Sequence, residues 1–225
     1  MPVRKTNRGV GGLTGYVTKG YKNASGTDDE AIFFESSLER DYSERLKFRC
    51  LITKEVAGFE EQPLTLEYQG TSGKTRRYTP DVLVVFTEPG RMPELVEIKY
   101  RAKLRKILAE MAPAYRAAKT LCAERGWRFR VQTEYSIRTP ALKHARFFPK
   151  YLDRQHDPRL LALVLNATHL LESITVGQLL AQLACASASR AELLSVIWTL
   201  VARQFLLIDD QTPPSTASVI RPAVS

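Results

Sequence analysis

Apolar side chains recur at every fourth position in one stretch of the first third of the chain. Leu38, Tyr42 and Leu46 have this spacing, and neither glycine nor proline interrupts it. Such spacing lines one face of an α-helix, so the sequence predicts a short amphipathic helix over residues 34–48, with the serines before Leu38 as caps. Glu39 lies one position away from the apolar stripe.

Beyond this helix the apolar residues alternate with polar ones or form short runs, which is typical of β-strands separated by glycine and proline turns. The predicted strands are residues 59–68, 78–86 and 95–100. Helical spacing returns over residues 104–118, where Pro113 is expected to kink the helix, and alternation over residues 127–131 predicts a fourth strand. A strand, a helix and a second strand connected in this way favour parallel pairing of the last two strands.

The pattern changes again near residue 150. Helices are predicted at residues 160–171, 176–183 and 191–201, and a short strand at residues 205–208. Ser189, followed three residues later by Glu192, gives the last helix a capping-box pattern. Short helices and a β segment in so small a region indicate a winged-helix or helix-turn-helix module.

Both ends of the chain lack apolar periodicity. Residues 4–30 are rich in Gly, Lys and Arg, which predicts a basic arm that orders on a partner, and the last residues are predicted to be disordered. The expected parts are a flexible basic arm (1–30), an α/β domain (31–150), a winged-helix-like domain (151–210) and a disordered tail (211–225).

The composition is that of an ordinary folded protein. Of 225 residues, 44% are hydrophobic and 25% are charged, which excludes collagen-like, coiled-coil and wholly disordered chains. No apolar run approaches the roughly 20 residues that cross a bilayer, and no apolar signal core follows the first residues, so a cytoplasmic protein with no membrane partner is expected. Cys50, Cys122 and Cys185 form no C-x-x-C pattern, so neither a disulfide framework nor a zinc site is predicted.

Positive charge is concentrated in one segment. Residues 91–150 contain 15 Lys and Arg against 5 Asp and Glu, whereas residues 1–90 contain 13 of each kind. The pI of the chain is about 9.6. Such a segment either meets a polyanion, most commonly nucleic acid, or forms a solvated surface, and charge alone favours neither.

Charged residues with chemical potential lie on two neighbouring predicted strands. Asp81 heads one apolar strand, and Glu97-Ile98-Lys99 lies on the next. Because strand side chains alternate, Glu97 and Lys99 share a face while Ile98 points into the core. Carboxylates on adjoining strands can converge on one or two Mg²⁺ ions, with Glu39 of the preceding helix as a third ligand. The metal would activate a water, and Lys99 would orient that water or bind phosphate oxygens.

The alternative is that Glu97 and Lys99 form an ordinary salt bridge on a solvated strand face. Against it, the neighbours Leu95, Val96 and Ile98 are apolar and lack the clean alternation of a half-solvated strand. Placing a glutamate and a lysine in such a strand costs free energy, and proteins accept such a cost mainly at functional sites. The pattern therefore favours a functional site.

Five short strings occur in the order expected for a helix, three strands and the end of a fourth strand. They are Ser37-Leu38-Glu39-Arg40-Asp41-Tyr42, Phe59-Glu60-Glu61-Gln62-Pro63, Tyr78-Thr79-Pro80-Asp81-Val82-Leu83-Val84, Leu95-Val96-Glu97-Ile98-Lys99-Tyr100 and Thr133-Glu134-Tyr135-Ser136-Ile137-Arg138. With these strings, residues 35–150 resemble the PD-(D/E)XK nuclease superfamily, and more narrowly the TnsA endonuclease subunits of heteromeric transposases. The resemblance implies an α/β fold with a restriction-endonuclease-like αβββαβ core and a small helical, winged-helix-like C-terminal domain.

The resemblance also implies a function. Glu39, Asp81 and Glu97 would be the metal ligands, Lys99 the catalytic lysine, and Mg²⁺ the cofactor, for which Mn²⁺ can substitute; family members can carry Gln where Glu97 stands. The implied activity is cutting of the 5′ strand at transposon-end DNA during cut-and-paste transposition. The implied partners are a TnsB-like DDE transposase, which cuts the other strand, and a TnsC-like AAA+ ATPase.

Basic residues directly after the Glu97-Ile98-Lys99 motif lie where a loop enters a helix, which favours phosphate contacts. Past the fourth strand, Glu134 and Arg138 are expected to form a salt bridge, with a phosphate contact by Arg138 as the alternative. The predicted DNA-binding residues are Lys19, Lys22, Arg101, Lys103, Arg105, Lys106 and Arg138.

Two other functions stay open. A stand-alone restriction or repair nuclease of the same superfamily would cut DNA by itself, whereas a transposase subunit is expected to be nearly silent alone. A non-catalytic DNA-binding scaffold would use the C-terminal part to recruit partners, but the intact acidic residues and the lysine argue against it.

Overall fold

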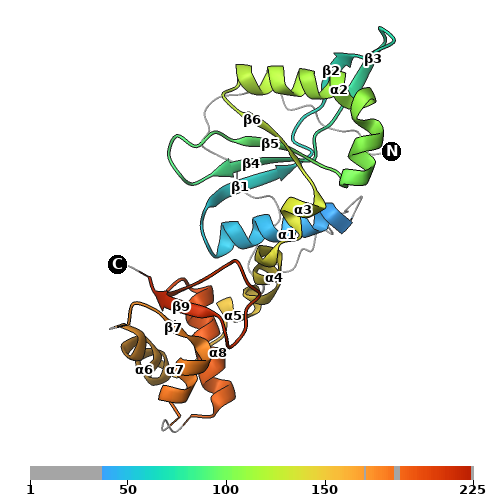
Figure 1. Ribbon diagram of the computed structural model, residues 1–225. Helices are drawn as coiled ribbons and strands as arrows, with labels where there is room; N and C mark the ends of the chain where they lie inside the picture. The colour runs from blue at the N-terminus through green and yellow to red at the C-terminus, as the bar shows by residue number, and fades with distance from the viewer. Residues whose placement is uncertain (1–36, 170, 185–187, 224–225) are drawn as a thin grey trace.

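The computed structural model describes residues 37–169, 171–184 and 188–223. The larger lobe is built around a four-stranded sheet with the order β1-β4-β5-β6 (Figure 1). The core elements are α1 (Ser37–Leu51), β1 (Val56–Glu61), β4 (Val82–Phe86), β5 (Glu94–Ile98), α2 (Arg101–Glu124) and β6 (Arg128–Gln132). β4 pairs antiparallel with β1 and β5, and β6 pairs parallel with β5. The predicted mixed α/β architecture and parallel last pair are confirmed, and the element order is compatible with a restriction-endonuclease-like fold.

The two faces of this sheet are covered by different helices, α1 on one side and α2 on the other (Figure 1). Val96 belongs to the buried cluster of Leu46 in α1, and its neighbour Leu95 to the cluster of Cys122 in α2. Burying an apolar side chain of this size stabilises the fold by roughly 1.5–3 kcal/mol. Because side chains two positions apart share a face, Glu97 lies on the α2 face with Leu95.

The predicted strands over residues 59–68 and 78–86 are wrong in extent, because each is divided in the structure. Between β1 and β4 the chain forms a separate antiparallel hairpin of β2 (Leu66–Gln69) and β3 (Thr75–Tyr78). A proline lies at each junction between this hairpin and the central strands. Proline has no N–H to donate to a sheet ladder, so the central strands stop there.

Pro113 lies inside α2, as the sequence predicts. Its missing N–H and its ring disturb the preceding turn, and the two halves of α2 run in different directions in Figure 1. The first half stands at the end of the sheet where β5 meets the helix, and the second half lies along the sheet.

Short helices that the sequence analysis did not predict lead from the sheet to the C-terminal part. They are α3 (Glu134–Ile137), α4 (Pro140–Phe147) and α5 (Pro149–Leu152). Proline begins both α4 and α5, where its fixed φ suits the first helical position. These helices are too short for apolar periodicity to distinguish them from loops. α4 packs against α1 and thereby joins this connection to the central fold.

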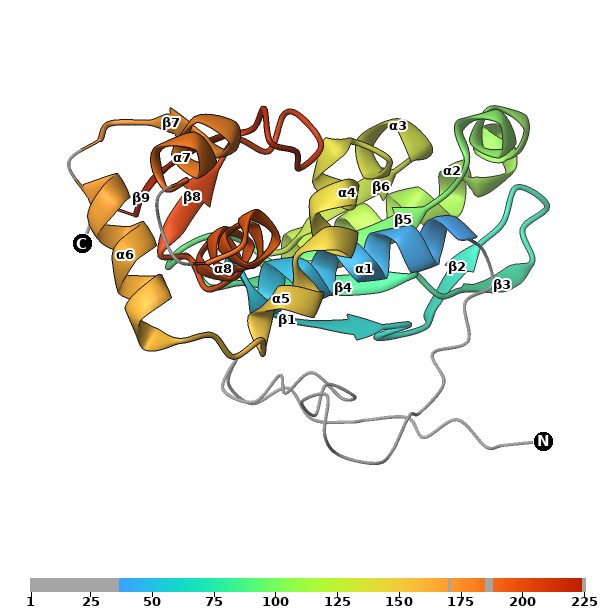
Figure 2. The ribbon, with the colours of Figure 1, turned by 90° about the horizontal axis from the view of Figure 1, so that it is seen from below.

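Within the described residues, the C-terminal part contains the predicted helices and a small sheet in the order β7-β9-β8 (Figure 2). The helices are α6 (Pro158–His169), α7 (Val176–Gln182) and α8 (Arg190–Ala202). The strands are β7 (Ile174–Thr175), β8 (Leu206–Ile208) and β9 (Val219–Pro222). The Ser189 hydroxyl accepts a hydrogen bond of 3.2 Å from the Glu192 N–H, as the capping pattern predicts. The winged-helix assignment stays a prediction.

The prediction that the tail over residues 211–225 is disordered is wrong for β9. This strand pairs with both β7 and β8, and Ile220 is 0% exposed while Val219 is 44% exposed. One buried isoleucine in a strand of four residues gives too little periodicity to be detected in the sequence.

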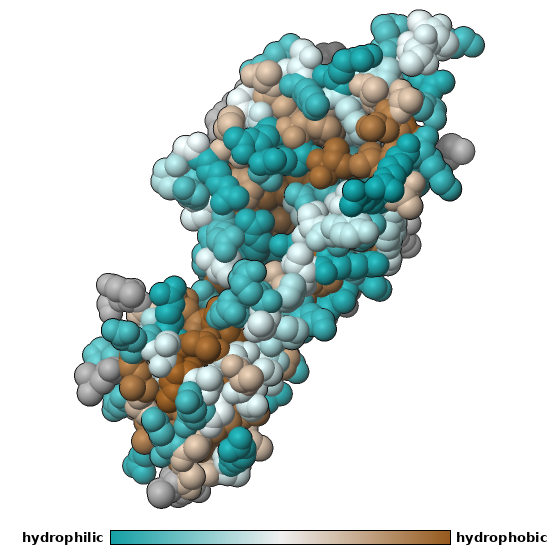
Figure 3. Space-filling model, viewed as in Figure 1, coloured by the Kyte–Doolittle hydropathy of each residue, from teal (hydrophilic) through white to brown (hydrophobic). Residues whose placement is uncertain are grey.

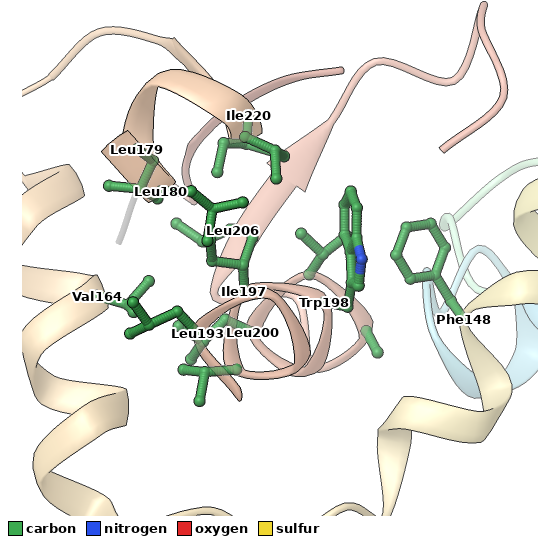
Figure 4. Packing of buried hydrophobic residues seen from close by; sticks show 14 of the residues in the cluster. Phe148, Val164, Leu179, Leu180, Leu193, Ile197, Trp198, Leu200, Leu206 and Ile220 are labelled. Carbon is green, nitrogen blue, oxygen red and sulfur yellow. The ribbon is translucent and has the colours of Figure 1, made fainter. Parts of the chain in front are cut away.

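The C-terminal part has its own apolar core (Figure 4). Trp198 of α8 faces Phe148, with ring centroids 5.9 Å apart. Ile52, directly after α1, is 3% exposed and belongs to the same cluster. This core therefore includes residues that precede the predicted domain boundary at residue 150.

On the face shown in Figure 3, hydrophilic surface separates an apolar area of the larger lobe from a second apolar area near β9. Phe205, directly before β8, is 54% exposed, and Val219, the first residue of β9, is 44% exposed. No helix in the described part of the chain has both the length and the apolar character needed to cross a membrane. The predicted basic arm, with Lys19 and Lys22, lies outside the described residues.

Candidate active site

The strands that carry the predicted site residues meet at one end of the central sheet. Asp81 directly precedes β4 and Lys99 directly follows β5, and because these strands are antiparallel the start of one lies beside the end of the other. The Ile98 N–H donates a hydrogen bond of 2.6 Å to Asp81 Oδ2, and the Asp81 N–H donates one of 3.1 Å to the Val96 carbonyl. α1 and α2 both begin at this end of the sheet (Figure 1).

Glu97 is a buried carboxylate, with an exposed fraction of 1%. Its Oε2 accepts a hydrogen bond of 2.7 Å from the Tyr78 hydroxyl, and its Oε1 lies 3.0 Å from Lys99 Nζ. A carboxylate removed from water keeps its charge only with such partners. Glu97 and Lys99 therefore do form a salt bridge, but not on a solvated strand face.

Lys99 joins the two carboxylates. Its Nζ lies 3.0 Å from Glu97 Oε1 and 3.5 Å from Asp81 Oδ2. Burial lowers the pKa of Lys99, but the charges of Glu97 and Asp81 outweigh this effect and the pKa is raised. Lys99 is therefore an ammonium at neutral pH, suited to attract a phosphate oxygen and not to accept a proton.

Asp81 lies in a pocket with excess negative charge. Burial and the charge of Glu97 raise the pKa of Asp81 to about 6, against the opposing effects of Lys99 and the Ile98 N–H. Two carboxylates against one ammonium leave a negative charge that a bound cation would compensate.

Glu39 lies on the helix before the strands, as the sequence predicts. It lies in the first turn of α1, which packs on the sheet face opposite Glu97. Its charge raises the pKa of Lys99 and that of Glu61, so it acts on the site electrostatically. In the part of the chain that the structure describes, no three Asp, Glu, His or Cys side chains are grouped to hold a metal ion. The assignment of Glu39, Asp81 and Glu97 as ligands of one metal stays a prediction.

The carboxylates at the end of the sheet nevertheless fit a hard cation. Mg²⁺ in enzymes is usually held by one or two carboxylates, with water and substrate phosphate oxygens completing the octahedron. Asp81 and Glu97, both within 3.5 Å of the same ammonium, provide such a pair. They suit a site that is completed by water and by the phosphate oxygens of a substrate.

The cations predicted to bind DNA after the motif are exposed at the start of α2; these are Arg101, Lys103, Arg105 and Lys106. The Arg101 N–H donates a hydrogen bond of 2.9 Å to Glu134 Oε2. The Arg101 guanidinium lies 5.2 Å from the ring centroid of Tyr135, which is 69% exposed. The start of α2 thus presents positive charge and an aromatic ring beside the carboxylates.

Arg138 is engaged within the protein. Its Nε donates a hydrogen bond of 2.7 Å to Asp41 Oδ2, and its Nη2 donates to the hydroxyls of Ser37 at 3.2 Å and Tyr100 at 2.9 Å. Its salt-bridge partner is therefore Asp41, where the sequence analysis expected Glu134. The DNA contact predicted for Arg138 stays a prediction.

Sequence analysis missed the supporting residues Tyr78 and Asp41. Tyr78 ends β3 and reaches Glu97 from outside the central sheet, so strand alternation does not relate the two. The available signal was the buried glutamate itself, because a buried carboxylate requires a donor. Asp41, 3% exposed on α1, has the same requirement.

One family model, described as TnsA-like endonuclease N terminal, matches residues 53–134. This range contains Asp81, Glu97 and Lys99 and excludes Glu39. No curated protein matches the chain. Residues 53–134 are therefore similar to the N-terminal domain of the TnsA-like endonucleases.

Proposed function

We propose that this chain is the endonuclease subunit of a Tn7-like heteromeric transposase. It would cut the 5′ strand at the ends of a mobile element, while a DDE transposase partner cuts the other strand. The observation that carries the proposal is the contact of Lys99 with both Asp81 and Glu97, inside the region that matches the TnsA-like model. Partly buried charges with raised pKa values at the end of a sheet are typical of catalytic sites.

Asp81 and Glu97 would hold Mg²⁺, with Mn²⁺ as a substitute, and Glu39 would serve as the third carboxylate. When bound, the ion would supply a Lewis acid and lower the pKa of a coordinated water. The Ile98 N–H orients Asp81 and the Tyr78 hydroxyl orients Glu97. Lys99 would bind a non-bridging oxygen of the scissile phosphate and stabilise the charge that develops there.

The exposed cations at the start of α2 would bind DNA phosphates that flank the scissile bond, which fixes the register of the duplex without selecting a sequence. Residues 151–225 contain 5 Lys and Arg against 6 Asp and Glu, a balance unsuited to DNA. We assign this winged-helix-like part to a protein contact, with the AAA+ ATPase as the proposed partner.

The test is strand-specific cleavage of transposon-end DNA by the purified chain together with its DDE transposase and AAA+ ATPase. We expect the wild type to cut the 5′ strand only with its partners. Asp81→Ala should lose this cut while it keeps its fold, its partner binding and the transposase's cut of the other strand. Glu88→Ala, at an exposed glutamate in the turn between β4 and β5, is the matched control and should cut like the wild type.

Other outcomes would select other functions. Undiminished cutting by Asp81→Ala would remove the proposed metal site. Efficient cutting by the chain alone would assign a stand-alone nuclease. Binding of DNA and partners without any cut, in Mg²⁺ and in Mn²⁺, would assign a scaffold.

A further inference from the structure

We propose that Arg138 is a positioning residue that holds the helix bearing Glu39 against the strand end bearing Lys99. This inference rests on the proposed nuclease function, since it concerns how the same site is assembled. Arg138 directly follows α3, at its C-cap, and so belongs to neither of the two elements that its side chain joins.

On the α1 side, Arg138 contacts residues that flank Glu39. Its Nε lies 2.7 Å from Asp41 Oδ2 and its Nη2 lies 3.2 Å from Ser37 Oγ. Ser37 and Asp41 stand two positions before and two positions after Glu39. Asp41 is 3% exposed, so this contact also satisfies a buried charge.

On the strand side, Arg138 contacts the residue that follows Lys99. Its Nη2 donates a hydrogen bond of 2.9 Å to the Tyr100 hydroxyl, and its guanidinium carbon lies 5.4 Å from the Tyr100 ring centroid. The Tyr100 hydroxyl is also 2.8 Å from Ser37 Oγ, which closes a ring of hydrogen bonds between α1 and the end of β5. A planar guanidinium can direct donors to several acceptors at fixed angles, which an ammonium cannot do.

These contacts distinguish positioning from binding of DNA. Asp41 compensates the charge of Arg138, and the donors that would face a phosphate are directed at Asp41, Ser37 and Tyr100. Glu39 lies in a turn whose two neighbouring polar side chains are both fixed by Arg138. A shift of about 1 Å in such a group can cost on the order of 100-fold in rate.

Arg146 provides a matched control. Its Nη2 lies 2.5 Å from Asp41 Oδ1 and its Nε lies 2.6 Å from Glu44 Oε2, so it binds the same aspartate. Both acceptors belong to α1, so these ion pairs fasten α1 to α4 and not to Tyr100. Loss of Arg146 should therefore weaken the packing of α1 without releasing Glu39 from the strand that bears Lys99.

The experiment compares Arg138→Gln, Arg138→Lys and Arg146→Gln in the full chain with its partners. For Arg138→Gln we expect unchanged DNA affinity and salt dependence, but a cleavage rate at saturating DNA that is at least roughly tenfold lower. Arg138→Lys should recover part of this rate. Arg146→Gln should lower the thermal midpoint at least as much while it cuts like the wild type per folded molecule.

A second readout does not depend on cutting. Amide hydrogen exchange in the first two turns of α1 should accelerate in Arg138→Gln and less so in Arg146→Gln. Weaker DNA binding with a shallower salt dependence and an unchanged saturated rate would instead assign Arg138 to a phosphate. If Arg138→Gln and Arg146→Gln reduced the cleavage rate equally, Arg138 would contribute only to the stability of the fold and would not be a positioning residue. A wild type that never cuts would refute the proposed nuclease, and the exchange comparison would still decide whether Arg138 holds α1 in place.

Discussion

Glu97 is buried, and two donors contact its carboxylate. The Tyr78 hydroxyl and the Lys99 ammonium each contact one of its oxygens. Tyr115 lies in the same cluster as Tyr78, and burial and the nearby Glu97 carboxylate raise its pKa, but its hydroxyl makes no hydrogen bond of ordinary geometry among the described residues. The hydroxyl groups of these two tyrosines should therefore contribute differently to the free energy of unfolding.

This difference gives a paired prediction. Tyr78→Phe should lower the free energy of unfolding by about 1.5–3 kcal/mol, because it removes a hydrogen bond to a buried charge. Tyr115→Phe should cost clearly less, because the Tyr115 hydroxyl makes no hydrogen bond of ordinary geometry among the described residues, although Glu97 is near enough to act on it. Urea unfolding of both variants measures the two free energies. Equal destabilisation of the two variants would contradict the contact with Glu97.

The raised pKa of Asp81 makes stability depend on pH. Its pKa rises from the ordinary 3.8 to about 6 in the folded chain. Between these values the folded chain holds a proton that the unfolded chain has released, so the stabilising contribution of Asp81 falls as pH rises through this window. Asp81→Asn should remove this slope in metal-free urea unfolding and should raise stability at neutral pH. An unchanged slope in Asp81→Asn would assign the pH dependence to another group.

Divalent cations should show the opposite trend at the same residue. A metal binds the deprotonated carboxylate, so affinity for Mn²⁺ should rise as pH passes about 6 and then level off. Calorimetric titration at pH values from about 5 to about 8 measures this dependence. Constant affinity over this range would exclude Asp81 as a ligand.

At the scale of single residues, the sequence was sufficient to predict contacts between side chains on neighbouring strands, but not contacts between more distant elements. Asp81 and Lys99 could be predicted to meet because antiparallel neighbours bring the start of one strand beside the end of the next. The place of Glu39 could not, because a helix can cover either face of a sheet. Arg138 has Asp41 as its partner, 97 positions earlier in the chain, and no local pattern relates them.

Among the elements, the long periodic helices were predicted, whereas several of the short elements were missed. α2 and α8 contain enough apolar positions to reveal their period. β9, with four residues, and the β2–β3 hairpin were missed or merged with their neighbours. Their formation depends on tertiary partners, which carry no signal in the local sequence.

β9 provides a test at the scale of the element. Ile220→Ala should lower the free energy of unfolding by about 2–5 kcal/mol, because the side chain is fully buried. Val219→Ala, at the 44% exposed neighbour, should cost much less. Denaturant unfolding monitored by Trp198 fluorescence reports on this core. Two silent substitutions would mean that this segment is a disordered tail after all.

For the whole molecule, the uneven distribution of charge separates two roles. The basic segment, residues 91–150, includes Glu97 and Lys99 of the candidate active site, and the C-terminal part is close to neutral. If the basic segment makes the contacts with DNA, the affinity for DNA should fall steeply as the salt concentration rises. Contacts made by the C-terminal part should add little to this salt dependence.

Replacement of Lys103, Arg105 and Lys106 by Gln should weaken binding to all DNA sequences alike. The slope of log affinity against log salt should become shallower by about 0.9 for each phosphate that is no longer neutralised. Arg77→Gln, at an exposed arginine paired with Glu67 at 3.1 Å on the hairpin, is the control for a general change of charge. Salt-dependent binding measurements test this prediction. Equal slopes for the two variants would mean that DNA binds to another surface of the protein.

Asp81, Glu97 and Lys99 are proposed to form a metal-dependent site for cutting DNA, and iron-directed cleavage of the protein is the sharpest test of this site. Fe²⁺ replaces Mg²⁺ on the complex with transposon-end DNA, and added peroxide breaks the polypeptide near the bound ion. We expect breaks close to Asp81 and to Glu97, suppressed by excess Mg²⁺ and absent in Asp81→Asn. Breaks confined to other segments, or unchanged by Asp81→Asn, would contradict the proposed site.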